Sequence, residues 1–410
     1  MKRPRIDFLS PPFAGHLHPI LGMARALEPH YEVRVATTPC AESSVRAAGL
    51  TAVTLLAGWE GRLRDVVDTP AAVGSHPLRL YRQFVKALGV HEQVRVELER
   101  LYENSRPDLM IADFTLLAAG PVARNRGIPW WTSLPSPCVL EGGDGPPCYF
   151  GGLMPKKGLV GRARDAAGWA MIRGFKHFVG ALFRENMRRL GLSSVYRADR
   201  SEAIYSDERL LIVGWQDLEF RKVWPAYARF VSPFLFTPPN ATGVPAFTPG
   251  RQHVLVTLGT HLPWAKQAVA HSVRDLARRT PRIEYHFSDG DIGGNTVEQQ
   301  DNFHRLSFID YERHLGRYDL VIHHGGSGVM YHCLAKARPA LVFPVDYDQF
   351  DNAARLEHAG LARRLRRLRD LPALVESALA DEGLKERCRR FAGQHRTEHT
   401  FLEQVDAWFS

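Results

Sequence analysis

A glycine-rich segment in the last quarter of the chain has the composition of an anion-binding turn. The apolar run 319–323 predicts a strand buried on both faces, and the residues from Val329 onward have helical spacing. Three glycines without a Cβ stand between these elements: Gly325, Gly326 and Gly328. Because backbone N–H groups at the start of a helix have no partner within the helix, such a turn can bind phosphate.

Two side chains in the same turn could contact a bound anion. His324 offers an imidazole and Ser327 a hydroxyl. The segment therefore predicts a phosphate or diphosphate site. A tight strand-to-helix turn that serves packing alone is the simpler alternative.

A polar pair follows the next predicted strand. The run 338–345 is apolar, and Asp348 and Gln349 come after its carboxyl end. Ligands of open parallel sheets bind at that edge. A carboxylate beside an amide offers acceptors and a donor for sugar hydroxyls. A phosphate site followed by a polyol site suggests a nucleotide-sugar as the ligand.

The stretch 323–352 resembles the donor-binding signature of glycosyltransferase family 1, the UDP-glycosyltransferases of plants and bacterial natural-product pathways. The resemblance rests on the turn 324–328, Arg338-Pro339, Phe343-Pro344 and Asp348-Gln349. Their combined spacing is more specific than any one of them, and the likeness extends over nearly the whole chain. The family implies an enzyme, a hexosyltransferase, with these donor-binding positions: Thr260, Phe308, Ile309, His324, Gly325, Gly326, Ser327, Gly328, Asp348 and Gln349.

The amino-terminal loop carries a second resemblance. Gly15-His16-Leu17-His18-Pro19 resembles the family's Gly-His-x-x-Pro motif, which implies that His16 is the general base. An imidazole near its reference pKa can take the proton of an acceptor hydroxyl as that oxygen attacks. The family further implies that Asp113 orients this histidine. An N-cap for the following helix is the structural alternative for Asp113, and His18 is structural or faces the acceptor.

The base-binding stretch departs from the family pattern. The resemblance implies that Phe308 stacks on the nucleotide base, that the Ile309 backbone reads the base edge and that Thr260 lies near the diphosphate. The usual Pro-Gln is replaced by Asp310-Tyr311. Uracil and thymine, hence UDP- and dTDP-sugars, both stay open.

The elements that must position these residues form two α/β units. Arg5–Ser10 predicts a strand, Pro11–Pro19 a turn, Ile20–Leu27 a helix and Tyr31–Ala36 a second strand, which is a Rossmann-like opening. Thr115–Arg126 predicts a helix. The resemblance implies the GT-B fold: two Rossmann-like doubly wound domains that face each other across a cleft. We expect an acceptor-binding domain at 1–232, a linker at 233–250, a nucleotide-sugar-binding domain at 251–394 and a helix at 395–410 that crosses back.

Composition is that of a globular protein of two domains. The 410 residues are 45% hydrophobic and 24% charged, with a net charge of +9, and no nucleic-acid motif accompanies that charge. No run approaches the about 18 apolar residues of a membrane-spanning helix. The five cysteines are scattered, show no metal-ligand spacing and fit a reducing cytoplasm.

Residues 155–190 combine basic and apolar side chains at helical spacing. Two helices packed on the core with a solvated basic face are the simpler interpretation. A wall of the acceptor pocket and a peripheral membrane contact are the alternatives. Aromatic residues here favour a flat or greasy acceptor. The sequence does not indicate the oligomeric state.

The resemblance implies inverting transfer of a hexose or deoxyhexose from a UDP- or dTDP-sugar to a hydroxyl of a hydrophobic small molecule, a natural product or a lipid. The nucleotide-sugar is a co-substrate, so we expect no cofactor. We also expect no metal, although Asp289-Gly-Asp291 and Asp346-Tyr-Asp348 could hold one. A nucleotide-sugar epimerase or hydrolase on the same fold is one rival function. A non-catalytic auxiliary relative that activates a transferase is the other.

Overall fold

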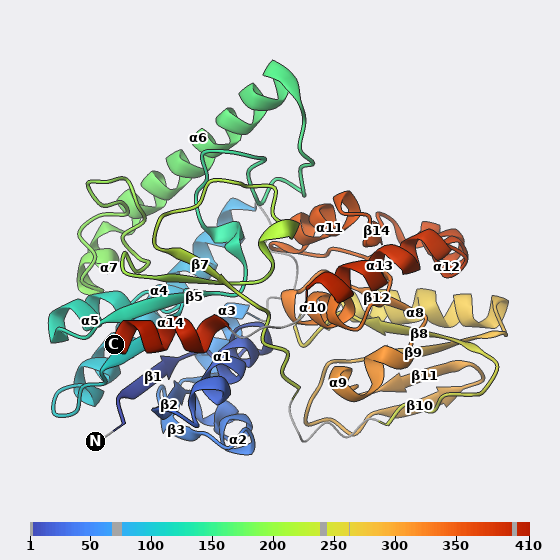
Figure 1. Cartoon of the computed structure of the whole chain (residues 1–410), viewed down its shortest axis with the longest axis horizontal. Helices are drawn as coiled ribbons and strands as arrows, with labels where there is room; N and C mark the ends of the chain where they lie inside the picture. Colours follow the sequence, from blue (N-terminus) through green and yellow to red (C-terminus); the bar gives the residue numbers. More distant parts are fainter. Residues whose placement is uncertain (1–2, 68–75, 238–243, 262, 396–399) are drawn as a thin grey trace.

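The chain folds around two seven-stranded sheets that lie side by side (Figure 1). The computed structural model describes residues 3–67, 76–237, 244–261, 263–395 and 400–410. The first sheet is parallel throughout, in the order β3-β2-β1-β4-β5-β6-β7. Its strands are β1 (Arg5–Leu9), β2 (Glu32–Thr37), β3 (Thr51–Thr54), β4 (Leu109–Asp113), β5 (Trp130–Leu134), β6 (Leu210–Val213) and β7 (Ala228–Val231).

The second sheet has the order β10-β11-β9-β8-β12-β13-β14, and only the edge strand β10 is antiparallel to its neighbour. Its strands are β8 (Gln252–Thr257), β9 (Ile283–Ser288), β10 (Val297–Gln300), β11 (Phe303–Leu306), β12 (Leu320–His323), β13 (Ala340–Val342) and β14 (Ala362–Arg364). The two parallel sheets with their crossover helices are the doubly wound units of the GT-B fold, which confirms the predicted fold class.

Helices cover both sheets. Those of the first unit are α1 (Ala14–Leu27), α2 (Pro39–Ala47), α3 (Glu60–Val67), α4 (Pro77–Leu101), α5 (Ala119–Arg126), α6 (Gly158–Leu182) and α7 (Arg184–Arg189). Those of the second are α8 (Pro263–Arg279), α9 (Tyr311–His314), α10 (Ser327–Ala335), α11 (Gln349–His358), α12 (Leu371–Leu379) and α13 (Glu382–Gln394). The last helix, α14 (Thr400–Phe409), lies over the first unit (Figure 1).

Contacts of α14 tie the end of the chain to the first sheet. Phe401 and Val405 are buried in the core that α1 and β1 share, and the rings of Phe401 and Phe234 are 5.6 Å apart. The Tyr31 hydroxyl donates to the Asp406 carboxylate at 2.6 Å. The expected helix 395–410 includes residues 396–399, and the expected linker 233–250 includes residues 238–243; both of these stretches lie outside the described residues.

Two helices begin elsewhere than predicted. The region Pro11–Pro19 was expected to be a turn, but α1 starts at Ala14, so His16 and Pro19 are helical. Packing of Leu17 and Ile20 into the core outweighs the turn preference of Gly and Pro. Helix α5 starts at Ala119 and not at Thr115. The β10–β11 hairpin was not predicted, because its sequence is mostly polar.

Helix α6 is a long, exposed element at the top of the first unit in Figure 1. Only Gly161 and Gly168 are buried along it, and Met171 and Phe178 are each 63% exposed. The expectation of a core-packed helix pair is therefore wrong for α6. Among the described helices, none has the length and apolarity to cross a membrane.

Candidate active site

Several of the predicted site residues follow strands at the two points where strand order reverses. In the first sheet β1 lies beside β4, and in the second β8 lies beside β12. Crossovers leave these neighbouring strands in opposite directions, which opens a crevice beyond their carboxyl ends. His16 follows β1 and Asp113 ends β4, whereas Thr260 follows β8 and the glycine-rich turn follows β12.

His16 and Asp113 form a hydrogen-bonded pair. Nδ1 of His16 lies 3.1 Å from Oδ1 and 3.0 Å from Oδ2 of the carboxylate. The carboxylate is fully buried, while 26% of the His16 side chain is exposed. The backbone N–H and the hydroxyl of Thr115 both donate to Asp113, at 2.9 and 2.5 Å. Helix α5 begins later, with Ala118 as its N-cap, so Asp113 does not cap that helix, and its carboxylate hydrogen-bonds with His16.

The carboxylate raises the pKa of His16 above its ordinary value. Burial alone would lower that pKa, but attraction to Asp113, the hydrogen bond between them and the more distant charge of Asp348 outweigh it. With Nδ1 held by the carboxylate, Nε2 is the nitrogen left to accept a proton. The pair has the composition of an oriented general base.

One large cavity lies between the two units. Its volume is about 640 Å³, and residues of both units line it. Helices α1 and α10 contact each other beside it. The expected site residues that line it are His16, Thr260, Phe308, His324, Gly326, Ser327, Gly328, Asp348 and Gln349. Asp113 stands behind His16, and Gly325 and Ile309 lie outside the lining.

The turn before α10 requires glycine at two positions. Gly325 has φ +94°, and a Cβ there would lie 2.9 Å from the Gln349 carbonyl oxygen. A Cβ on Gly326 would lie 2.3 Å from Nε2 of His324. Gly326 is the N-cap of α10 and carries no side chain, so no cap competes for the first N–H groups of the helix. These donors and the positive end of the helix are available to an anion.

His324 is neutral at physiological pH. Burial and, to a lesser extent, the nearby charge of Lys266 lower its pKa to about 4, against a smaller opposing effect of the Thr257 backbone. The imidazole can therefore donate a hydrogen bond to phosphate but cannot supply a positive charge.

Gln349 is more restricted than its position in the sequence suggests. Its Oε1 accepts the backbone N–H groups of Val345 and Asp346, at 2.9 and 3.0 Å. The amide oxygen is thus occupied, and the Nε2 group is what remains for a ligand. Asp348 is half-buried, and Asn352 donates to it at 3.3 Å. The pair can offer carboxylate acceptors and an amide donor to a polyol.

The predicted base site contains a second aromatic residue. Phe308 lines the cavity, and its ring is stacked with Tyr311 at a centroid distance of 6.1 Å. Tyr311, which also lines the cavity, hydrogen-bonds through its hydroxyl to the Thr257 hydroxyl at 3.0 Å. Asp310 caps α9 by accepting the N–H of Arg313. Ile309 is fully buried, so only its backbone could read a ligand.

The opposite end of the cavity is apolar and is formed mainly by α4. Phe84, Leu88 and Val94 of this helix line it, together with Leu116 and Ile204 from other segments. No residue of 155–190 is among the described residues that line the cavity, so the alternative of an acceptor wall in that region is not supported.

The contribution of α4 to the cavity was not predicted, because helical spacing identifies the apolar face of a helix but not what that face contacts. His18 and His91 also line the cavity, and burial lowers the pKa of each to about 4.

The two Asp-x-Asp triplets serve other contacts. Asp289 forms a bidentate ion pair with Arg305, at 2.9 to 3.1 Å. The Asp346 carboxylate accepts the backbone N–H of Tyr347, and the Asp348 carboxylate accepts an N–H of the Asn352 side-chain amide. Within the described residues, the groups of three or more side chains close enough to share an ion lie elsewhere: Cys138, Cys148 and Asp351; and Glu284, His286 and His304.

Comparison with known families matches the second unit. Residues 255–405 fit the model of the glycosyltransferase family 28 C-terminal domain. This match includes the glycine-rich turn and the polar pair at 348–349. It covers the part of the chain in which the donor was predicted to bind.

Similar proteins extend over nearly the whole chain. The 4'-demethylrebeccamycin synthase of Lentzea aerocolonigenes is 25% identical over 90% of this chain and 83% of its own. The solved structure of the glycotransferase of kitacinnamycin has a TM-score of 0.70 at 22% identity, over 97% of this chain and 96% of its own. That of glycosyltransferase VinC in complex with dTDP has a TM-score of 0.64 at 17% identity, over 95% of each chain.

Proposed function

We propose that this chain, a glycosyltransferase with the GT-B fold, transfers a hexose or deoxyhexose from a UDP- or dTDP-sugar to a hydroxyl of a hydrophobic small molecule, with inversion at the anomeric carbon. The observation that carries the proposal is the cavity that His16 shares with the start of α10. A base and an anion-binding helix end are the two groups that a single displacement needs. We assign acceptor binding to a domain at 1–232 and donor binding to a domain at 251–394. Residues 233–250 form the linker between them, and residues 395–410 contain the helix that crosses back to the first domain.

The proposed step is one displacement. The acceptor oxygen forms a bond to the anomeric carbon as the bond from that carbon to the diphosphate oxygen breaks. Nε2 of His16 takes the acceptor proton, and Asp113 stabilises the imidazolium through Nδ1. The leaving diphosphate gains negative charge, which the N–H groups at Ser327 and the neutral His324 stabilise by hydrogen bonds. Attack opposite the leaving group inverts the configuration.

We propose that the donor lies along the second unit. The diphosphate meets Gly326 and Ser327, with Thr260 across from them, and the sugar hydroxyls meet Asp348 and the Gln349 amide. The base stacks on Phe308. The bound dTDP in VinC, a protein of the same fold, supports a thymine or uracil nucleotide.

Membership of glycosyltransferase family 1 is part of the proposal. Its support is the spacing of the turn 324–328, Arg338-Pro339 and Asp348-Gln349, together with Gly15-His16 at the other end. Relatives named for natural products, such as the zeaxanthin glucosyltransferase of Pseudescherichia vulneris, support an apolar acceptor, as does the α4 wall.

We further propose that the reaction needs no cofactor and no metal at the diphosphate. The helix end at Ser327 can take the place of a cation. Transfer should therefore be insensitive to Mg²⁺ or Mn²⁺. Restoration of a chelated, inactive enzyme by either ion would overturn this part.

We also propose a peripheral membrane contact through 155–190 and a cytoplasmic location. Exposed Met171 and Phe178 stand among many basic residues on α6, which suits an anionic lipid surface. The described cysteines are all free, which fits a reducing compartment. Sedimentation with anionic but not with neutral vesicles would support the contact, and equal sedimentation with both, or with neither, would refute it.

Donor consumption with and without acceptor tests the proposed function against its rivals. A transferase consumes the nucleotide-sugar in proportion to product and needs acceptor. An epimerase or hydrolase consumes it alone, and an auxiliary protein consumes none. A thermal-shift screen with UDP, dTDP and their sugars tests the donor. If none of these compounds stabilises the protein, the donor assignment is refuted.

A further inference from the structure

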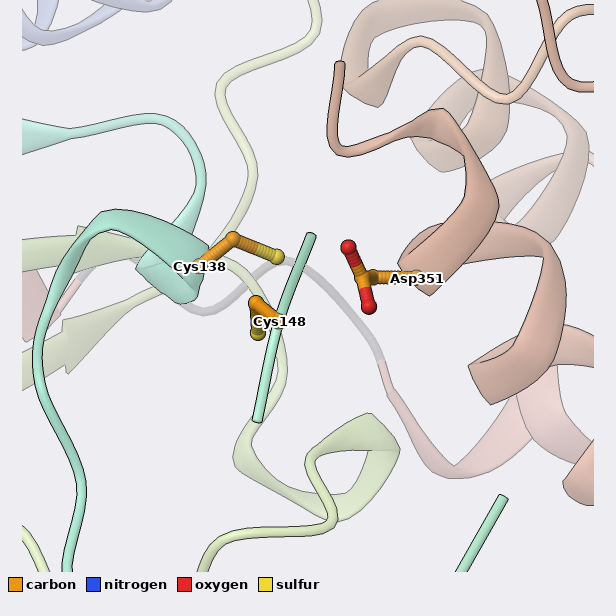
Figure 2. Close-up of side chains that lie close together, drawn as sticks. All are labelled: Cys138, Cys148 and Asp351. Atoms are coloured by element: carbon orange, nitrogen blue, oxygen red, sulfur yellow. The ribbon is translucent and has the colours of Figure 1, made fainter. Parts of the chain in front are cut away.

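A cluster of two thiols and a carboxylate lies between the two units, outside the cavity of the proposed reaction. Cys138 is in the short helix η1 (Pro137–Val139), Cys148 is in the loop that follows, and Asp351 is on α11. One ligand atom of each lies within 4.8 Å of the others. Figure 2 shows Cys138 and Asp351 pointing toward each other across the gap, with Cys148 beside Cys138. All three residues are at least nine-tenths buried.

The Arg355 guanidinium beside the cluster favours negative charge on the two sulfurs. Arg355 donates from Nη1 to the Cys138 sulfur at 3.1 Å and approaches the Cys148 sulfur from Nη2 at 3.7 Å. A guanidinium is a better partner for a thiolate or a metal-bound thiolate than for a neutral thiol. Arg355 has its own counter-ion, Glu219, at 2.9 Å. The backbone N–H of Tyr149 orients the Asp351 carboxylate at 2.9 Å, as the second shell of a metal site does.

A small cavity adjoins the cluster. Its volume is about 20 Å³, and Cys148, Asp351 and Arg355 are among its lining residues. A space of this size holds one water molecule. Two sulfurs, one carboxylate oxygen and one water are a four-coordinate set that zinc accepts, whereas magnesium and calcium require oxygen ligands.

We propose that Cys138, Cys148 and Asp351 bind one zinc ion, with a water in the adjoining cavity as the fourth ligand. Binding replaces two thiol protons by one divalent ion, so the net charge of the buried cluster does not change. The two protons go to solvent. Both cysteines belong to one segment of the first unit. The ion would connect that segment to α11, the helix that begins with Gln349.

In the other group of potential ligands, Glu284, His286 and His304, the carboxylate already has hydrogen-bond partners. Both oxygens of Glu284 already accept hydrogen bonds, Oε2 from His253 at 2.9 Å and Oε1 from His304 at 3.0 Å. Thr248 donates to the same carboxylate through its N–H and its hydroxyl, each at 3.0 Å. The Glu284 carboxylate is thus satisfied by protein groups, whereas Nε2 of His286 is buried with no hydrogen-bond partner among the described residues.

Cobalt substitution tests the site in the full chain. The purified protein is treated with a chelator under reducing conditions, and Co²⁺ is titrated while the absorption is recorded. We expect one Co²⁺ per chain with a thiolate-to-cobalt charge-transfer band, and displacement of that band by one equivalent of Zn²⁺. Binding without that band, or no stoichiometric binding, would overturn the proposal.

Variants identify the ligands. Cys138→Ser and Cys148→Ser should each diminish the charge-transfer band, whereas Cys40→Ser, which removes an exposed cysteine, should leave it unchanged. Asp351→Asn keeps both sulfurs, so the charge-transfer band should survive. Loss of a side chain that only hydrogen-bonds to a metal ligand weakens binding by roughly tenfold, so loss of a ligand itself should lower Co²⁺ affinity by at least that factor. An unaltered titration in Cys138→Ser or Cys148→Ser would contradict the assignment.

Two measurements on the unmodified chain remain decisive if the variants fail to fold. Zn²⁺ should raise the midpoint of thermal unfolding of the chelator-treated protein, and Mg²⁺ should not. Thiol titration after denaturation without reductant should find all five cysteines reduced. Three reduced thiols, with Cys138 and Cys148 joined in a disulfide, would overturn the proposal, as would equal effects of the two ions.

Discussion

His16 Nδ1 lies 3.0 Å from Asp113 Oδ2, although the two residues are 97 positions apart in the chain. They meet because β1 and β4 are neighbours in a parallel sheet, so that the start of α1 and the end of β4 share one edge. The carboxylate is buried and held by Thr115, and the imidazole borders the cavity. The first three predictions concern this pair.

Replacement of the carboxylate should impair catalysis without loss of the fold. Asp113→Asn keeps the size of the side chain but cannot stabilise an imidazolium, and its amide can reverse the orientation of the His16 ring. We expect kcat to fall by about 10²-fold or more, with the donor Kd unchanged. Steady-state kinetics and calorimetry measure the two. A donor Kd that weakens as much as kcat falls would assign Asp113 a structural role.

The pH dependence of the reaction should follow the raised pKa of His16. The base acts unprotonated, so kcat/KM should fall on the acid side with a midpoint above the ordinary value of 6.5. In Asp113→Asn both raising effects of Asp113 are lost, while the lowering effect of burial and the smaller raising effect of Asp348 remain, so the midpoint should move to lower pH. A midpoint that stays in place would exclude His16 as the titrating base.

The same raised pKa predicts a stability difference that depends on pH. The charged pair stabilises the folded state fully below the pKa of unfolded histidine, and that contribution disappears as pH rises through the higher folded pKa. Asp113→Asn should therefore lower the unfolding midpoint more in acid than in alkaline buffer. Thermal unfolding across this range measures it, and the reverse trend would contradict the pairing.

A methyl group at Gly326 should disrupt the phosphate turn. It would lie 2.3 Å from Nε2 of His324, so the ring must move. We expect Gly326→Ala to weaken nucleotide-sugar binding and to cost roughly 1–3 kcal/mol of unfolding free energy. Gly316→Ala is the control, because a Cβ there meets nothing within 4 Å and Gly316 lies outside the cavity lining. If Gly326→Ala bound the donor with wild-type affinity, the proposal that this turn binds the diphosphate would be contradicted.

Phe308 should bind the base through its ring. Phe308→Leu keeps an apolar side chain at this buried position but removes the stacking surface. We expect loss of about 1–3 kcal/mol in nucleotide binding, or roughly 5- to 150-fold in Kd. Phe308→Tyr, which keeps an aromatic ring, should restore most of it. Equal Kd values for the Leu and Tyr variants would remove Phe308 from the base site.

The acceptor should contact α4 and not α6. Phe84→Ala removes a ring that lines the cavity, so the acceptor KM should rise by about tenfold or more. Phe178→Ala removes a ring that is 63% exposed on α6 and should leave the acceptor KM unchanged. A larger effect at Phe178 would contradict this assignment and support the alternative of an acceptor wall at 155–190.

Local signals predicted the second unit well. The strand that ends at His323, the glycines and the start of α10 at Ser327 are adjacent in the sequence. The local structure explains the residue types at these positions. Gly325 needs a positive φ, and Gly326 must leave room for His324. Such a turn can be identified without knowledge of the rest of the chain.

Contacts between distant segments could not be predicted from periodicity. The His16–Asp113 pair was expected only through the family resemblance. The start of α1 depends on packing of Leu17, and the acceptor end of the cavity depends on which face α4 turns inward. Cys138, Cys148 and Asp351 show no metal-ligand spacing, and they meet only because the two units pack together.

The most direct measurement is the comparison of transfer and donor binding in His16→Ala, with His18→Ala on the same helix as the control. If the diphosphate binds at Ser327 and faces His16, transfer in His16→Ala should fall by about 10²- to 10⁴-fold. The Kd of the UDP- or dTDP-sugar, measured by calorimetry, should stay near that of the wild type. Transfer by His16→Ala at the wild-type rate would contradict the account.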